Sequence, residues 1–241
     1  MNSRCNIVQR GLNYDMNDET AKAVQEIAKT TGKAIDLVNN FGRFIAKFIA
    51  GPLEQGIGIF HDKLIYMRWE RQARLIKRSK DFLNEVGLSD PTRPVPLNIA
   101  IPLLQAASLE EDDELQDRWA KLLVNAGNAN SDVVIKRSYI SILEDLSPMD
   151  ARILEKICSV ALQEDESILA YKLPDEAVIY KNNMLFPEPS QDVQLSLSNL
   201  MRLGCITLPI FMGGRLNFTE VQPTLLGSCL VEACTLQNKK T

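Results

Sequence analysis

Residues 108–128 read SLEEDDELQDRWAKLLVNAGN, and this stretch carries the strongest structural signal in the chain. Apolar side chains recur there at helical spacing, so one face of a helix would hold Leu115, Trp119, Leu122 and Leu123. Ser108, followed three residues later by Glu111, fits the capping-box pattern that starts many helices. We therefore predict an amphipathic helix with Trp119 in the protein core.

Five consecutive acids, Glu110 to Glu114, stand at the start of this helix. Clustered carboxylates suit magnesium or calcium, but neighbouring residues on a helix point in different directions and do not converge on one ion. Negative charge at a helix start also interacts favourably with the helix dipole. We interpret the run as capping and solvation, with a charge-complementary contact as the next alternative, and we predict no metal site. Helical spacing further predicts the ion pairs Glu114–Arg118 and Asp117–Lys121.

Helical periodicity is the main pattern of the residues that precede position 147. We predict helices over Asp18–Asn39, Phe41–Ala50, Ile59–Val86, Leu97–Ala107 and Lys136–Leu146. Three prolines in residues 89–96 mark a turn between two of these helices. The fold class is therefore mainly α, with an α-helical region over residues 1–146.

The pattern changes after Pro148. Helices are predicted over Met149–Leu162, Val193–Leu203 and Gly227–Thr235, and short strands over Ile168–Tyr171, Ala177–Tyr180, Cys205–Ile210 and Arg215–Thr219. The last two strands flank Met212-Gly213-Gly214, which is typical of a hairpin turn. This order of elements predicts a small α+β, winged-helix-like domain over residues 147–241.

A DNA-binding role for that domain is not favoured by its candidate recognition helix. Arg202 is the only cation in QDVQLSLSNLMRLG, and Asp192 lies near the start of the same helix. A DNA reader needs several phosphate contacts as well as donors for base edges. We therefore favour a structural or protein-interaction role.

The strongest candidate for a functional surface is a basic stripe on the helix predicted over Ile59–Val86. Six cations lie between Arg68 and Lys80, opposed there only by Glu70. The stripe is formed by Arg68, Arg71, Arg74 and Arg78. The first interpretation is a solvated helix face or intramolecular pairing with the acidic run. The alternatives are contact with anionic lipid, and less favoured, with nucleic acid.

A second amphipathic segment gives the lipid hypothesis its motive. Phe44 and Phe48 share a helical face, and Arg43 and Lys47 lie toward the other face. Such an apolar face is usually buried in a helical core. The alternative is insertion into one membrane leaflet beside the basic stripe. The candidate residues for membrane or anionic-partner contact are therefore Phe44, Phe48, Arg68, Arg71, Arg74 and Arg78.

Composition restricts the remaining classes of function. The 241 residues carry a net charge of −4, so no global positive field attracts nucleic acid. Five cysteines without a CxxC pair indicate a reduced, intracellular compartment, and a single histidine, His61, does not favour a zinc site. The chain has no signal-peptide pattern and no run of about 18 uncharged apolar residues. We find no catalytic motif, so we predict no cofactor and favour a non-enzymatic mechanism.

The order of four segments resembles the Abi-alpha (abortive infection alpha) family of bacteria. These segments are residues 51–88, 96–126, 138–154 and 225–234, and the most specific are LQDRWAKLL after the acidic run and SILEDLSPMDARIL. The resemblance extends over roughly residues 45 to 235. It implies a role in antiphage defence by abortive infection and brings no catalytic residues with it.

The expected mechanism combines this resemblance with the two amphipathic segments. We expect a cytoplasmic protein, with peripheral association at the inner membrane, that acts through a protein partner or homo-oligomer and through an anionic membrane surface. The alternative is a nucleic-acid-associated regulator or toxin that uses the winged-helix-like domain or the basic helix.

Overall fold

The computed structural model describes residues 42–49, 69–160, 166–180, 186–210, 214 and 216–237. The helix predicted over Asp18–Asn39 lies outside the described residues. The same is true of the first part of the helix predicted over Ile59–Val86, which includes Arg68.

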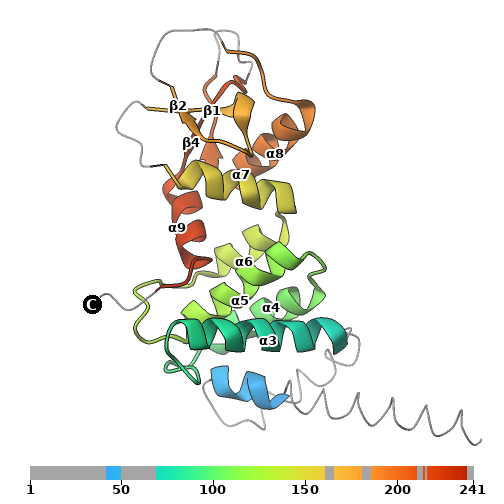
Figure 1. Cartoon of the computed structure of the whole chain (residues 1–241), viewed down its shortest axis with the longest axis vertical. Helices are drawn as coiled ribbons and strands as arrows, with labels where there is room; N and C mark the ends of the chain where they lie inside the picture. Colours follow the sequence, from blue (N-terminus) through green and yellow to red (C-terminus); the bar gives the residue numbers. More distant parts are fainter. Residues whose placement is uncertain are drawn as a thin grey trace, which may run out of the picture.

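The first described part is a stack of helices, which confirms the predicted fold class. It contains α3 (Trp69–Glu85), α4 (Leu97–Leu109), α5 (Asp113–Gly127) and α6 (Arg137–Glu144). Residues 42–48 are also helical and lie against α3 on the side away from α5 (Figure 1). The amide of Val95 donates to the carbonyl of Phe48 at 2.6 Å, which ties this segment to the turn before α4.

The start of α5 differs from the prediction. The capping box of Ser108 and Glu111 is wrong, because α4 continues to Leu109 and the Ser108 hydroxyl donates to the Gln105 carbonyl inside it. Asp112 is the N-cap instead, and its carboxylate accepts hydrogen bonds from the amides of Glu114 and Leu115. The Trp119 prediction is confirmed, because its side chain is buried among the core residues.

The second part combines three helices with a small sheet. The helices are α7 (Pro148–Cys158), α8 (Gln191–Arg202) and α9 (Leu225–Ala233), with a short 3-10 helix η1 (Ala170–Lys172). The strands are β1 (Ile168–Leu169), β2 (Val178–Ile179), β3 (Ile206–Thr207) and β4 (Glu220–Pro223). These four strands pair antiparallel, in the order β2-β1-β4-β3.

The predicted hairpin is present as the β3–β4 pair, with its second strand later than expected. Residues 220–223 pair with β3, whereas the predicted strand Arg215–Thr219 contributes one isolated bridge between Leu216 and Ile210. The winged-helix-like arrangement stays a prediction, as does a domain boundary between residues 146 and 147.

The two parts share one apolar core. Buried side chains of α3 to α6 and of α7 to α9 belong to a single cluster. Figure 1 shows α9 running from the sheet toward the helical stack, with the sheet and α8 at one end of the long axis and α3 toward the other. This arrangement makes α5 the central helix, in contact with α3, α4, α7 and α9.

Candidate functional site

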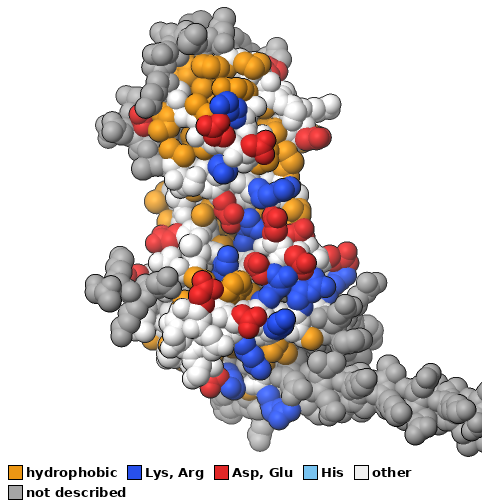
Figure 2. All heavy atoms as spheres, viewed as in Figure 1, with side chains coloured by type: hydrophobic (Ala, Val, Ile, Leu, Met, Phe, Trp, Pro, Cys, Tyr) orange, Lys and Arg blue, Asp and Glu red, His pale blue; other side chains and the backbone are white. Residues whose placement is uncertain are grey.

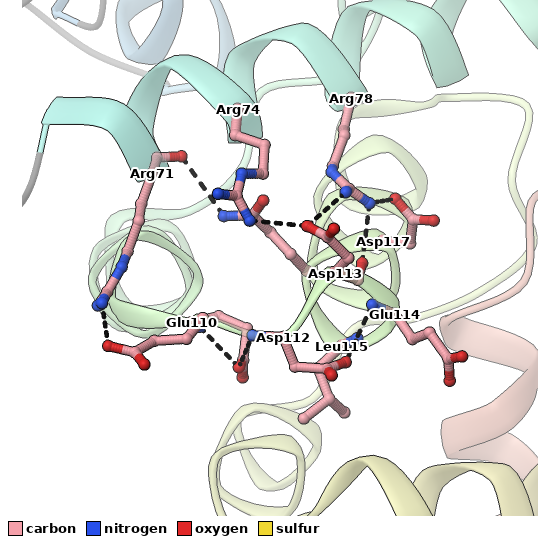
Figure 3. A network of polar contacts seen from close by, with 11 residues as sticks. Arg71, Arg74, Arg78, Glu110, Asp112, Asp113, Glu114, Leu115 and Asp117 are labelled. Atoms are coloured by element: carbon pink, nitrogen blue, oxygen red, sulfur yellow. Dashed lines mark hydrogen bonds and ion pairs between the residues drawn. The ribbon is translucent and has the colours of Figure 1, made fainter.

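Three arginines of the predicted stripe lie on one face of α3. Arg71, Arg74 and Arg78 are spaced by three and four residues, so their side chains project on the same side of the helix. That side faces the acidic run at the start of α5 (Figure 3). We call these three residues the basic face.

Each arginine of the basic face is ion-paired within the chain. Arg71 pairs with Glu111, Arg74 with Asp113 at 2.7 Å, and Arg78 with both Asp113 at 2.9 Å and Asp117. Arg71 and Arg78 also donate to the backbone carbonyls of Leu109 and Asp113 at 2.7 and 2.8 Å. We call Glu111, Asp113 and Asp117 the acidic clamp. The prediction of intramolecular pairing with the acidic run is confirmed.

The ion pairs of the acidic clamp contribute little to stability. Its carboxylate side chains are 75%, 70% and 39% exposed, so water screens the attraction. Exposed ion pairs contribute about 0–1 kcal/mol each, so the four pairs together contribute at most about 4 kcal/mol. Cations and anions interleave over this part of the surface (Figure 2). Salt or a competing polyanion would therefore weaken the contact between α3 and α5.

Three buried polar atoms on α3 and α5 lack hydrogen bonds within the described part of the chain. Ser79 Oγ, Gln116 Oε1 and Trp119 Nε1 are buried and have no hydrogen-bond partner among the residues that the structure describes. The Gln116 amide nitrogen faces α3 and donates to the Arg71 carbonyl at 3.4 Å. A buried polar group without a partner costs about 1–3 kcal/mol. Gln116 would gain water partners if the two helices separated, which lowers the cost of separation.

The five acids of the run point to different partners, as helical geometry requires. Glu110 accepts from the amides of Glu111 and Asp112, while Glu114 lies 3.9 Å from Arg152 on α7. In the part of the chain that the structure describes, no three histidine, cysteine or acidic side chains are arranged to hold a metal ion.

Phe44 and Phe48 lie in the core and not at the surface. Their side chains are 5% and 0% exposed, and their ring centroids are 5.0 Å apart. This placement agrees with the first interpretation of the segment, burial in a helical core. Arg68 lies outside the described residues. Membrane contact by these residues stays a prediction, and it requires a rearrangement of the conformation described.

Sequence reasoning missed the contacts that join α5 to the second part of the molecule. The predicted ion pairs Glu114–Arg118 and Asp117–Lys121 within α5 are wrong. Arg118 pairs instead with Glu155 on α7, and Asp117 pairs with Arg78 on α3. Asn125 donates to the carbonyls of Ala233 and Thr235 at 2.8 and 2.7 Å. The only signal in the sequence was a polar asparagine directly after the apolar run Leu122–Val124.

The buried cysteines lack the properties of nucleophiles. Burial raises the pKa of the Cys205 thiol to about 11 and that of Cys234 to about 12. Burial also raises the pKa of the Cys158 thiol. Because the thiolate is the reactive form, a raised pKa lowers the reactive fraction of these side chains at neutral pH.

Within the described residues, no helix combines the length and the apolar character needed to cross a membrane. Neither a curated protein nor a solved structure matches the chain. The family model of Abortive infection alpha matches residues 70–234, from the basic face through the acidic clamp to the end of α9. The chain therefore belongs to the Abortive infection alpha family and is a defence protein of the abortive-infection type.

Proposed function

We propose that this protein acts in abortive infection without catalysis, through a basic face that the acidic clamp holds in reserve until infection. The observation that carries this proposal is the pairing of Arg71, Arg74 and Arg78 with acids of α5. Once released, the arginines would bind the anionic inner surface of the host membrane. Phe44 and Phe48 would follow only after a larger opening, because they are buried.

The energies of the two states are close enough for a switch. The acidic clamp contributes at most about 4 kcal/mol. An anionic membrane surface attracts each nearby lysine or arginine by about 1 kcal/mol, so three arginines gain about as much as they lose. A small additional interaction, such as a bound partner, is then sufficient to shift the population. The arginines would exchange the carboxylates of the acidic clamp for the anionic membrane surface, and no covalent bond would form or break.

We assign the partner-binding role to the second part of the molecule. Leu195, Ile210 and Leu225 are large apolar side chains with 63%, 65% and 82% exposure. Exposed apolar groups of this kind suit contact with a protein, either an infection-derived trigger or a second copy of the chain. Arg202, the one cation of α8, is engaged by Asp145 at 3.1 Å and by Asn199, which supports a protein partner over DNA.

Flotation with lipid vesicles tests the membrane proposal. The intact protein, a clamp-open variant (Glu111→Gln/Asp113→Asn/Asp117→Asn) and the same variant with Arg71, Arg74 and Arg78 changed to Gln are mixed with vesicles of phosphatidylglycerol or phosphatidylcholine. We expect the clamp-open variant to float with anionic vesicles at low salt far better than the intact protein. Binding should disappear when the arginines are removed.

A matched control separates release of the basic face from a change in net charge. The variant Glu114→Gln/Asp132→Asn/Glu144→Gln loses three acids outside the acidic clamp, one of them from the same acidic run. It should behave like the intact protein. Equal flotation of the control and the clamp-open variant would contradict the proposal. If the clamp-open variant ignored vesicles but shifted RNA or DNA with a steep salt dependence, the nucleic-acid alternative would replace it.

A further inference from the structure

The structure contains a cavity on the side of α3 that faces away from the acidic clamp. It has a volume of about 470 Å³ and lies between the helical segment 42–48, α3 and the turn at Ser89–Pro91. α3 contributes Ala73, Ile76, Lys80 and Leu83, which share a face opposite the basic face by helical spacing. Its volume falls within the range of about 300–1,000 Å³ that is typical of small-molecule sites.

The lining of this cavity is divided into an apolar floor and a cationic rim. The floor consists of Phe44, Phe48 and Leu83, which are buried, with the half-buried Ala73 and Ile76. The rim consists of the exposed side chains of Arg43, Lys47 and Lys80. Asp90 is the one acid among the described lining residues, and it is ion-paired with Lys47.

We propose that this cavity binds a single-chain anionic amphiphile, an alkyl chain that carries a carboxylate or phosphate head. Lys47 is paired with Asp90, and Lys80 contributes a positive charge to the rim that an anionic head would neutralise. The floor offers aromatic and aliphatic carbon, which favours an alkyl chain over hydroxyl-rich anions such as sugar phosphates.

The ligand is a free molecule and not a lipid within a bilayer. A free alkyl chain can contact the half-buried Ala73 and Ile76 of the cavity, whereas Phe44 and Phe48 are buried and a planar membrane surface cannot reach them in this conformation. This gives the two phenylalanines a role that differs from leaflet insertion. The site uses the opposite side of α3 from the basic face, so the inference does not depend on the membrane proposal.

Calorimetric titration of the full chain with octanoate, decanoate and dodecanoate, without vesicles and below their micelle-forming concentrations, tests the site. We expect one molecule per chain. The Kd should fall about fourfold for each added methylene while the chain still fits, from the usual transfer free energy of a buried CH₂. Decyltrimethylammonium, a cation of similar chain length, should bind far more weakly.

Two variants and one control locate the binding. Ala73→Phe fills the cavity and should abolish decanoate binding, while Lys80→Glu reverses one rim charge and should raise the Kd about tenfold. Lys77→Glu makes the same charge change on an exposed position of α3 outside the lining, and should leave the Kd within about twofold.

Three results would overturn the proposal. The first is no saturable binding of any of the three carboxylates by the intact protein. The second is equal weakening by Lys77→Glu and Lys80→Glu, which would indicate only a general effect of surface charge. The third is unchanged binding by an Ala73→Phe variant whose circular dichroism shows a native fold. If Ala73→Phe fails to fold, the comparison of the two lysine variants decides the question.

Discussion

Arg118 on α5 and Glu155 on α7 form two parallel hydrogen bonds, each 2.8 Å long, across the contact between the two parts of the molecule. The arginine side chain is only 10% exposed, whereas the glutamate is 45% exposed. Water can therefore solvate the glutamate if its partner is lost, but it cannot solvate the arginine. Leaving the arginine without its partner therefore costs more stability than leaving the glutamate without its partner.

This asymmetry predicts unequal effects of two substitutions. Glu155→Ala should lower the free energy of unfolding by about 2–3 kcal/mol, because it leaves the buried guanidinium of Arg118 without its partner. Arg118→Met keeps an apolar side chain in the buried position and leaves a solvated carboxylate, so it should cost about 1 kcal/mol. Urea unfolding of both variants and of the double variant measures this. A larger loss for Arg118→Met would contradict the argument.

Asn125 should anchor the end of α9. Its side-chain amide donates to the carbonyls of Ala233 and Thr235, which lie at the carboxyl end of that helix. Asn125→Ala would leave these acceptors without that donor, and we expect a loss of about 1–3 kcal/mol in the free energy of unfolding. Hydrogen exchange should accelerate at residues 230–237. Asn130→Ala, an exposed position in the following turn, is the control and should change neither quantity.

Gly227 permits the close approach of α9 to the residue that precedes β3. A Cβ atom at this position would stand 2.1 Å from the Cys205 carbonyl oxygen, which belongs to backbone and cannot rotate away. Gly227→Ala should therefore cost about 3 kcal/mol or more in thermal or urea unfolding. Gly42→Ala is the control, because a Cβ there meets nothing within 4 Å. That helical position should gain stability, by up to about 1 kcal/mol.

The buried thiols predict a loss of stability at alkaline pH. The pKa of Cys205 is raised from 9.0 to about 11 and that of Cys234 to about 12, so the unfolded chain releases these protons at lower pH than the folded chain. Between pH 9 and 12 the unfolded state binds fewer protons, and the free energy of unfolding falls as pH rises. Below pH 9 the contribution is fully present.

Urea unfolding at pH 8 and pH 10.5 measures this dependence. A Cys205→Ala/Cys234→Ala variant should lose less stability between the two pH values than the intact protein. Some decline should remain, because burial also raises the pKa values of Cys158 and Tyr139. An equally steep decline in the variant would show that these two thiols do not contribute.

Local patterns predicted the elements well and their charge partners poorly. The burial of Trp119 followed from the period of the apolar residues in α5. The N-cap was misplaced because α4 continues to Leu109, so the Ser108 pattern falls inside a helix. Residues 220–223, and not Arg215–Thr219, pair with β3, and the same strand also pairs with β1, a contact that the local pattern did not indicate.

The residues of the candidate site could be predicted from the sequence, but their exact partners could not. Six cations between Arg68 and Lys80, together with the acidic run Glu110–Glu114, predict either a functional surface or intramolecular pairing. The sequence could not show that Arg78 takes both Asp113 and Asp117, because those residues lie 35 and 39 positions away along the chain. The cavity beside Lys80 had no sequence signal, since its lining comes from three separate segments.

The sequence by itself determined the helical character of the chain, the amphipathic face of α5, the positions of three of the four small strands and the resemblance to an abortive-infection family. Each of these depends on spacing along the chain, which reflects the period of helix or strand. Tertiary structure alone decided that the basic face of α3 is covered by the acidic clamp, that Arg118 binds α7, and that Phe44 and Phe48 are buried. A charged or amphipathic side chain has several partners of similar energy, and only the packing of helices selects one of them.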